Sequence, residues 1–331
     1  MKLNRISLLG SVTAMILIGA FAPIEPANAS TGKEPAASGQ TSGPHQDPSH
    51  VIVPEVPQSV TFAGKEISLD PIDMWERMDR ELTAMSYTHG NTLLAIKRAN
   101  RYFPVMAPIL KEQGVPADLI YLAAIESTLN PRALSPAKAA GMWQFMPSTG
   151  KEYGLEVSNE VDERYNVEKA TRAACKYLKD AYKKYGNWES VAASYNGGMA
   201  RISNELEAQQ ATSAYDLWLA DETMRYMFRL LAMKLIMENP QEYGFELRAD
   251  QLYQPIEYTS VEVRGAVADW PTWAAQHGTD YMTLREHNPW IRTKSLTNKA
   301  GKTYTVKIPS PKSLSRSKQG SKIYNPAWVI K

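Results

Sequence analysis

"AAIESTLNPRALSPAKAAGMWQFMPST", residues 123–149, is the stretch in which the chain departs from an ordinary amphipathic helix. Glu126 takes a position on the apolar face that Leu119 and Leu122 define, where another leucine would be expected. The helix cannot continue through Pro131, and a short segment dense in Gly, Trp, Gln, Met and Pro follows. This stretch therefore contains the residues that are the candidates for a functional site within the surrounding helices.

The carboxyl group of Glu126 allows two interpretations. An ionised carboxylate on an apolar face is costly unless it is paired, so such a group raises its pKa and keeps its proton, as a general acid must near neutral pH. Alternatively, Glu126 is a helix-end residue that points into solvent before the helix breaks at Asn130 and Pro131. Spacing alone leaves both interpretations open.

The segment "GMWQFMP", residues 141–147, also has two interpretations. Aromatic faces can cover the apolar side of a sugar ring while amides bond its hydroxyls, so this mixture of an aromatic, an amide and a thioether could line a sugar-binding cleft. Trp143, Phe145 and Met146 could equally be core side chains.

The first 29 residues have the pattern of a secretory signal peptide. Lys2 and Arg5 precede an apolar stretch at about 6–21, and Ala27-Asn28-Ala29 offers a small-residue cleavage site. The alternative, a membrane anchor, would need about 20 apolar residues. We therefore expect export to the periplasm or cell envelope, with no integral membrane segment after signal cleavage. The single cysteine, Cys175, supplies neither a lipid attachment site near the signal nor an internal disulfide.

Composition and periodicity predict a mainly α protein of about two domains. The net charge of +2 gives no reason to expect nucleic-acid binding. Residues 30–58 are rich in Ser, Gly, Pro and Thr and are predicted to be a disordered linker. Helical periodicity then runs from about residue 70 to residue 240, and the period changes beyond about 251 to a β-α-α-β pattern.

Three ordered motifs carry a resemblance to a known family. "ES-x-x-NP" begins at Glu126, "S-x-x-x-A-x-G-x-WQFMP-x-T" begins at Ser135, and "SYNGG" begins at Ser194. Together they resemble the catalytic domain of the soluble lytic transglycosylase family, and residues 67–245 look most like its membrane-bound lytic murein transglycosylase D branch. The resemblance implies a lysozyme-like α-helical catalytic domain at 111–248, preceded at 59–110 by a helical segment that packs on it.

The resemblance also assigns roles to individual residues. Glu126 matches the single catalytic acid of the family. Residues that match the substrate-binding cleft are Ser127, Ser135, Gln144, Met146, Tyr195 and Asn196. Gly141 would let another part of the chain pass closely.

The implied reaction is non-hydrolytic cleavage of the β-1,4 bond between N-acetylmuramic acid and N-acetylglucosamine. Protonated Glu126 would donate to the leaving oxygen and then, as a base, take the proton of the muramyl C6 hydroxyl, which closes onto C1 to give a 1,6-anhydromuramyl end. Hydrolytic glycosidases usually need two carboxylates. The nearby acids lie in polar stretches and are interpreted as solvated: Glu152, Glu156, Glu160, Asp162, Glu163 and Glu168.

Residues 249–331 resemble a degenerate LysM module followed by a tail. A LysM module is a small β-α-α-β fold that binds N-acetylglucosamine polymers. The anchors are "AAQHG", "LREHNPWI" and "YTVKIP", but "VADWPT" replaces the usual opening turn. Sugar binding and a bracing role for the catalytic domain therefore both stay open.

The resemblance implies peptidoglycan glycan strands as the partner and no metal or organic cofactor, and the sequence identifies no protein partner. His89, His277 and His287 fit no ligand spacing. Two other functions remain: a lysozyme-like hydrolase of the same bond, and a catalytically idle glycan-binding envelope protein.

Overall fold

The computed structural model describes residues 53–330. The predicted signal peptide and most of the predicted linker lie outside the described residues. At the end of that linker, Pro54 is buried and the carbonyl of Gln58 accepts a hydrogen bond from the amide of Leu69 at 2.8 Å. The last residues of the predicted linker, at 54–58, therefore contact the folded part of the chain.

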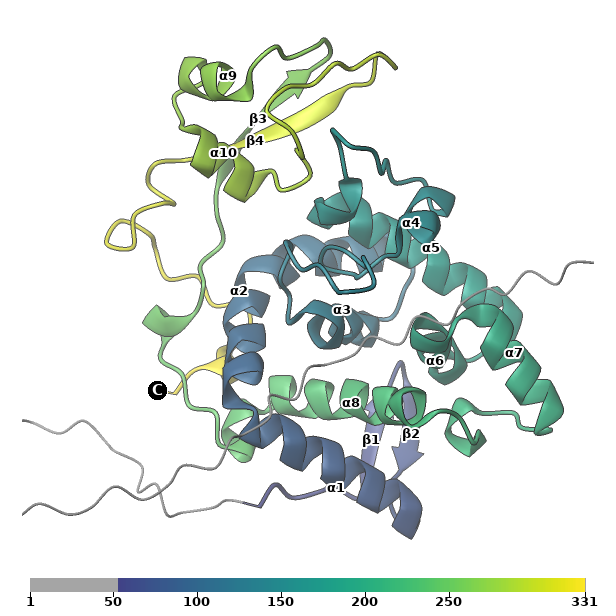
Figure 1. Ribbon diagram of the computed structural model, residues 1–331. Coiled ribbons are helices and arrows are strands. Elements are labelled where there is room, and N and C mark those ends of the chain that lie inside the picture. The colour runs from purple at the N-terminus through teal and green to yellow at the C-terminus, as the bar shows by residue number, and fades with distance from the viewer. Residues whose placement is uncertain (1–52, 331) are drawn as a thin grey trace, which may run out of the picture. The chain divides into compact units, whose positions relative to one another are not determined.

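Helices make up most of the described chain (Figure 1), which confirms the mainly α fold class. The α-helices between the two small sheets are α1 (Ile72–Tyr87), α2 (His89–Glu112), α3 (Ile120–Ser127), α4 (Pro147–Glu152), α5 (Val167–Tyr185), α6 (Trp188–Gly197), α7 (Met199–Ala208) and α8 (Asp221–Glu238). Short 3₁₀ turns at Ala117–Leu119, Glu163–Tyr165, Ala214–Asp216, Pro240–Tyr243, Ala249–Gln251 and Pro326–Trp328 connect or follow them.

Helix α8 forms the centre of the helical part. It packs against α1 on one side and against α3 and α6 on the other, and Figure 1 shows it running between α1 and α3. Leu230, Leu231 and Ile236 of α8 are completely buried. Because α8 is buried on more than one side, a polar side chain that it directs at α3 is held with little freedom.

Local capping residues define the ends of two of these helices. The side chain of Asn166 accepts a hydrogen bond from the amide of Lys169 at the start of α5. Asn187 does the same for Ser190 at the start of α6, and Gly186 ends α5 in the left-handed conformation with φ 69°.

The segment at 59–110 differs from the expected helical segment because it starts with a β-hairpin. Strands β1 (Ser59–Phe62) and β2 (Lys65–Ser68) pair antiparallel through a tight turn at Ala63 and Gly64, both of which have positive φ. Val60, Phe62 and Ile67 bury their side chains in the helical core. The alternation of apolar residues around this turn was the missed signal.

The C-terminal β-α-α-β pattern is confirmed. Strands β3 (Tyr258–Val263) and β4 (Tyr304–Pro309) pair antiparallel, and helices α9 (Trp270–Gln276) and α10 (Tyr281–His287) lie between them in the sequence. Asp269 and Asp280 cap the two helices by accepting hydrogen bonds from the amides of Thr272 and Thr283. We call this unit the β-α-α-β module.

The core of the β-α-α-β module includes residues from the helical part. Ala140, Val161 and Tyr165 belong to the same buried cluster as Trp270 and Trp290. In addition, the amide of Asp162 donates to the carbonyl of Trp290, and the amide of Arg292 donates to that of Glu160, both at 2.9 Å. A main-chain bridge and a shared core therefore join the module to the loop that precedes α5.

The chain returns to the helical part after β4, so the expected C-terminal unit at 249–331 contains a tail that packs elsewhere. Trp328 is buried there and donates from its indole to the carbonyl of Met237 at 2.6 Å. The buried amide of Asn100 on α2 binds both connections: its nitrogen donates to the carbonyls of Tyr253 and Lys322, and its oxygen accepts from the amide of Tyr324. The tail returns to the helical part because it buries the apolar side chain of Trp328 there.

No helix within residues 53–330 combines the length and the apolar character needed to cross a membrane.

Candidate active site

Glu126 lies in the last turn of α3, directly before an unusual chain reversal. Thr128 and Leu129 both adopt left-handed conformations with φ 53°, which non-glycine residues rarely do. Leu129 is completely buried, and a guanidinium nitrogen of Arg98 donates to the carbonyl of Thr128 at 3.0 Å. These contacts fix the end of α3 and therefore the direction of the Glu126 side chain.

Tyr226 of α8 contacts the carboxyl group of Glu126. Its hydroxyl donates a hydrogen bond to Glu126 Oε1 at 2.7 Å. The Glu126 residue keeps partial exposure, although its carboxyl is surrounded by protein. The interpretation of Glu126 as a solvent-pointing helix end does not fit this geometry.

Burial raises the pKa of Glu126 to about 7. The hydrogen bond from Tyr226 and the positive charge of Arg229 oppose this rise, and the negative charge of Glu222 adds to it. A carboxyl group with this pKa exchanges its proton near neutral pH, which lets one group act as acid and as base.

Tyr195 lies in the same cluster from α6. Burial raises the pKa of Tyr195 and of Tyr226 well above the usual range, with the charge of Glu126 as the second cause for both. The Tyr195 hydroxyl donates to the carbonyl of Trp143 at 2.7 Å, so this side chain holds the 141–147 segment against α6. Asn196 follows at the C-terminal end of α6 and is half-buried.

Two serines that match the family cleft make hydrogen bonds within the protein. The Ser127 hydroxyl donates to the carbonyl of Met142 at 2.8 Å, which ties the end of α3 to the 141–147 segment. The Ser135 hydroxyl accepts from the amide of Ala139 at 3.0 Å, which closes the loop after Pro131. In the structure both side chains hold the wall of the site.

Gln144 and Met146 lie in the 141–147 segment next to these contacts. Gln144 has φ 48°, and its side-chain nitrogen donates to the carbonyl of Gly141 at 2.8 Å. Gln144 and Met146 are half-buried, whereas Trp143 and Phe145 are core residues at 0% and 3% exposure. Trp143 and Phe145 are therefore core residues, whereas Gln144 and Met146 stay partly open to the surface.

Gly141 is confirmed as a point of close approach. It has φ +79°, and a Cβ atom there would lie 1.8 Å from the carbonyl oxygen of Arg164. A side chain at this position is excluded by the main chain that passes it.

The interpretation of the neighbouring acids as solvated is wrong for several of them. Asp162 and Glu163 are buried at 6% and 7% exposure, and Asp162 binds the buried guanidinium of Arg164 at 2.7 Å. Glu156 accepts from Lys302 and Tyr304 of the module at 2.8 and 2.9 Å. The polar residues around these acids gave no sign that the acids are buried or paired, because their partners lie elsewhere in the chain or in the next turn.

Sequence reasoning missed Tyr226, Arg229 and Glu222, which α8 supplies to the site. Their helix was predicted, but its apolar face gave no sign that it faced Glu126. A tyrosine hydroxyl on an otherwise apolar helix face was the available signal, because a buried hydroxyl needs a partner.

Within residues 53–330, no group of three or more His, Cys, Asp or Glu side chains is placed to hold a metal ion.

Comparison with known proteins finds a matching domain in each of two segments of the chain. Residues 105–217 match the transglycosylase SLT domain, and residues 259–312 match the soluble lytic transglycosylase C-terminal LysM-like domain. The chain thus contains a transglycosylase SLT domain followed by a LysM-like domain, which confirms the resemblance read from the motifs.

Individual proteins are similar to parts of this chain. The chain is 34% identical over 177 residues to membrane-bound lytic murein transglycosylase D of Escherichia coli K12, which covers 52% of this chain and 38% of the relative. It is 37% identical over 122 residues to a peptidoglycan transglycosylase of Escherichia phage T7, covering 36% of this chain and 9% of the relative. The crystal structure of the 70 kDa soluble lytic transglycosylase of E. coli gives a TM-score of 0.37 at 22% identity, over 41% of this chain and 24% of that one. The chain therefore spans under two fifths of the length of the E. coli relative.

Proposed function

We propose that this chain is a peptidoglycan lytic transglycosylase with Glu126 as its catalytic acid and base. The observation that carries the proposal is the enclosed carboxyl of Glu126, whose pKa is about 7 and which is oriented by Tyr226 at 2.7 Å. The transglycosylase SLT domain at 105–217 supports the substrate class, because its matched relatives are named as murein or peptidoglycan transglycosylases.

In the first step, protonated Glu126 donates its proton to the glycosidic oxygen as the bond from C1 of N-acetylmuramic acid breaks. The leaving N-acetylglucosamine end receives that proton. The N-acetyl group of the substrate can stabilise the positive charge that develops at C1. The Tyr226 hydroxyl and Arg229 favour the carboxylate that forms on Glu126, since both lower its pKa.

In the second step, ionised Glu126 takes the proton of the muramyl C6 hydroxyl, and the C6 oxygen bonds to C1. A 1,6-anhydromuramyl end forms, and Glu126 returns to its protonated state. One titrating group is enough for both steps, because its pKa lies near neutral pH. Residues proposed to line the cleft are Ser127, Ser135, Gln144, Met146, Tyr195 and Asn196.

We propose that the LysM-like domain braces the catalytic part. Its shared core with Val161 and Tyr165, and the bonds of Glu156 to Lys302 and Tyr304, support bracing. We further propose that the protein acts in the periplasm or cell envelope on glycan strands, without a cofactor.

Mass spectrometry of muropeptides released from purified sacculi tests this function. We expect anhydro-muropeptides from the unmodified protein and none from Glu126→Gln. Glu152→Gln makes the same chemical change at an exposed position of α4 and should keep the activity. Free reducing ends would instead identify a lysozyme-like hydrolase, and sacculi that are bound without release would identify a glycan-binding protein.

Glu222→Gln separates the two enzymatic possibilities. Glu222 is the carboxylate whose charge raises the pKa of Glu126, so it is the candidate for the second carboxylate of a hydrolase. If Glu126 works alone, this variant should retain anhydro-product formation. Complete loss of activity in a folded Glu222→Gln protein would favour hydrolysis.

A further inference from the structure

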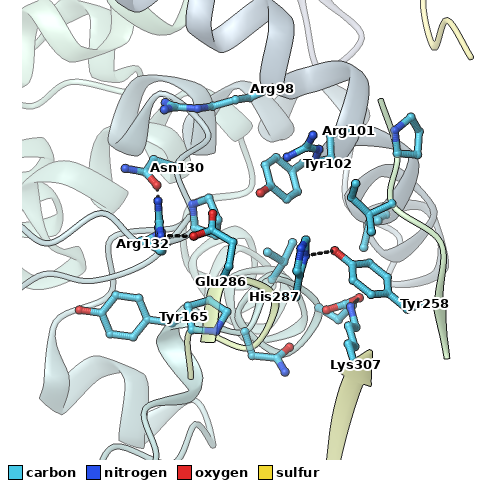
Figure 2. Close-up of a pocket in the computed structure, with 18 of the residues that line it drawn as sticks. Arg98, Arg101, Tyr102, Asn130, Arg132, Tyr165, Tyr258, Glu286, His287 and Lys307 are labelled. Atoms are coloured by element: carbon cyan, nitrogen blue, oxygen red, sulfur yellow. Dashed lines mark hydrogen bonds and ion pairs between the residues drawn. The ribbon is translucent and has the colours of Figure 1, made fainter. Parts of the chain in front are cut away.

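A cavity lies where α2 and the segment after α3 face the LysM-like domain. Its volume is about 300 Å³, and its lining includes Tyr102 of α2, Asn130 and Pro131 after α3, and Tyr258 of β3. Figure 2 shows side chains from these elements pointing into one space. Glu126 is not among the lining residues, so this cavity is separate from the candidate active site.

Both acidic side chains that line the cavity already have partners. Glu286 forms an ion pair with Arg132, and Glu168 forms one with Lys307 (Figure 2 shows the first as a dashed contact). These two pairs leave little net charge. Any excess of charge in the cavity must therefore come from other side chains.

Arg98 and Arg101 supply that excess. Arg98 donates to the carbonyl of Thr128 at 3.0 Å, and Arg101 donates from Nε to the carbonyl of Gln254 at 2.9 Å. Neither arginine forms an ion pair with a carboxylate in the described part of the chain. Both are half-buried, so their remaining N–H groups are poorly solvated. A planar guanidinium with free donors is suited to bind a carboxylate through two hydrogen bonds.

The walls around the two arginines are aromatic and apolar. Tyr102 and Tyr258 face the space in Figure 2, and Trp290, Pro131 and Pro255 also line it. The Tyr258 hydroxyl is within 3.0 Å of His287 Nδ1. A ligand that fits must therefore combine an anionic end with small apolar groups, within the lower range of volumes that hold small ligands.

We propose that this cavity binds the free carboxylate end of a short peptide with small side chains. The guanidinium groups of Arg98 and Arg101 would bind the carboxylate, and Tyr102 and Pro131 would contact the side chains. Peptidoglycan carries short peptide stems with this chemistry, so the identification of the peptide as a stem of the substrate rests on the proposed function.

Isothermal titration of N-acetyl-D-alanyl-D-alanine into the full chain tests the proposal, with its C-terminal amide as the matched ligand. We expect saturable binding of the acid and at least about tenfold weaker binding of the amide, because a lost charge-assisted hydrogen bond corresponds to about this factor. Arg101→Gln should weaken binding of the acid by a similar factor. Arg201→Gln, on the exposed face of α7, should bind like the unmodified protein.

Equal binding of acid and amide, or absence of saturable binding, would overturn the proposal. Tighter binding of inorganic phosphate than of the peptide acid would identify a phosphate site and overturn it as well. The acid–amide comparison uses the unmodified protein and does not depend on the folding of a variant. Binding should persist in Glu126→Gln, so failure of the proposed enzymatic function would leave this result unchanged.

Discussion

The hydroxyl of Tyr226 donates to the carboxyl of Glu126 at 2.7 Å across a sequence separation of 100 residues. This bond joins the end of α3 to the buried central helix α8. It also favours the ionised form of a group that burial otherwise keeps protonated. The position of Glu126 and its pKa are thus set partly by the same side chain.

Tyr226→Phe should therefore change both rate and pH dependence. Loss of a hydrogen bond to a charged group corresponds to about a tenfold fall in kcat/KM. Because the bond lowers the pKa of Glu126, its removal should move the alkaline limb of the pH–rate profile upward from about pH 7. Release of anhydro-muropeptides measured against pH checks both effects.

Tyr215→Phe is the matched control for this variant. The Tyr215 hydroxyl is buried and has no hydrogen-bond partner among the described residues. Its removal should leave rate and pH profile unchanged. An unshifted profile in Tyr226→Phe would show that the hydroxyl does not act on the ionisation of Glu126.

The pKa of Glu126 also predicts how stability varies with pH. A folded-state pKa of about 7, raised from the ordinary 4.5, means that the folded protein holds a proton which the unfolded chain has lost between these values. The contribution of this group is therefore fully present below the unfolded pKa and falls as pH rises through the folded pKa. Glu126→Gln should be more stable than the unmodified protein by roughly 2 to 3 kcal/mol at about pH 8.

Urea denaturation at about pH 4 and about pH 8 measures this difference, since the advantage of the glutamine should nearly disappear at the lower pH, where both states are protonated. A stability difference that does not vary with pH would contradict the raised pKa.

Asp162→Asn should destabilise the protein strongly. The carboxylate binds Nε and a terminal nitrogen of Arg164 at 2.9 and 2.7 Å, and both side chains are buried. Removal of one partner from a buried pair typically costs about 3 to 5 kcal/mol. Asp180→Asn removes an exposed partner of Lys183 and should change the free energy of unfolding by less than about 1 kcal/mol. Denaturant titration of both variants should show this contrast; similar small effects would mean that the Arg164 charge finds other partners.

Gly141→Ala should be far more damaging than Gly114→Ala. Both glycines have positive φ, +79° and +68°, so each substitution carries a backbone cost of roughly 1 to 2 kcal/mol. Only at Gly141 would the new Cβ meet main chain, 1.8 Å from the carbonyl oxygen of Arg164, whereas nothing lies within 4 Å of the Cβ at Gly114. Thermal unfolding compares the two variants, and equal losses would show that the chain at Arg164 moves away freely.

Much of the fold was predictable because its signals are local. The caps at Asn166 and Asn187, the stop at Gly186 and the β-α-α-β pattern depend on residues within a few positions of one another. The signal for the hairpin around Ala63 and Gly64 is also local. Its strands are only four residues long, and they were missed because the longer helical pattern that follows dominates the sequence.

The parts that could not be predicted depend on distant contacts. Glu126 could be singled out from its spacing, but its partner Tyr226 is specified only when α8 packs on α3. Glu156 looked solvated because its partners, Lys302 and Tyr304, lie in another domain of the chain. Polarity of the neighbouring sequence therefore gives little information about burial where two domains meet.

Asn100 has a consequence for how the C-terminal part can be removed or exchanged. Its buried amide forms hydrogen bonds with the chain before the LysM-like domain, at Tyr253, and after it, at Lys322 and Tyr324. In topological terms that domain is an insertion with two anchored ends and is no terminal appendage. A stop codon placed after α8 would also remove Trp328 from the core. A domain swap should therefore replace only the chain between these two anchors and keep the tail.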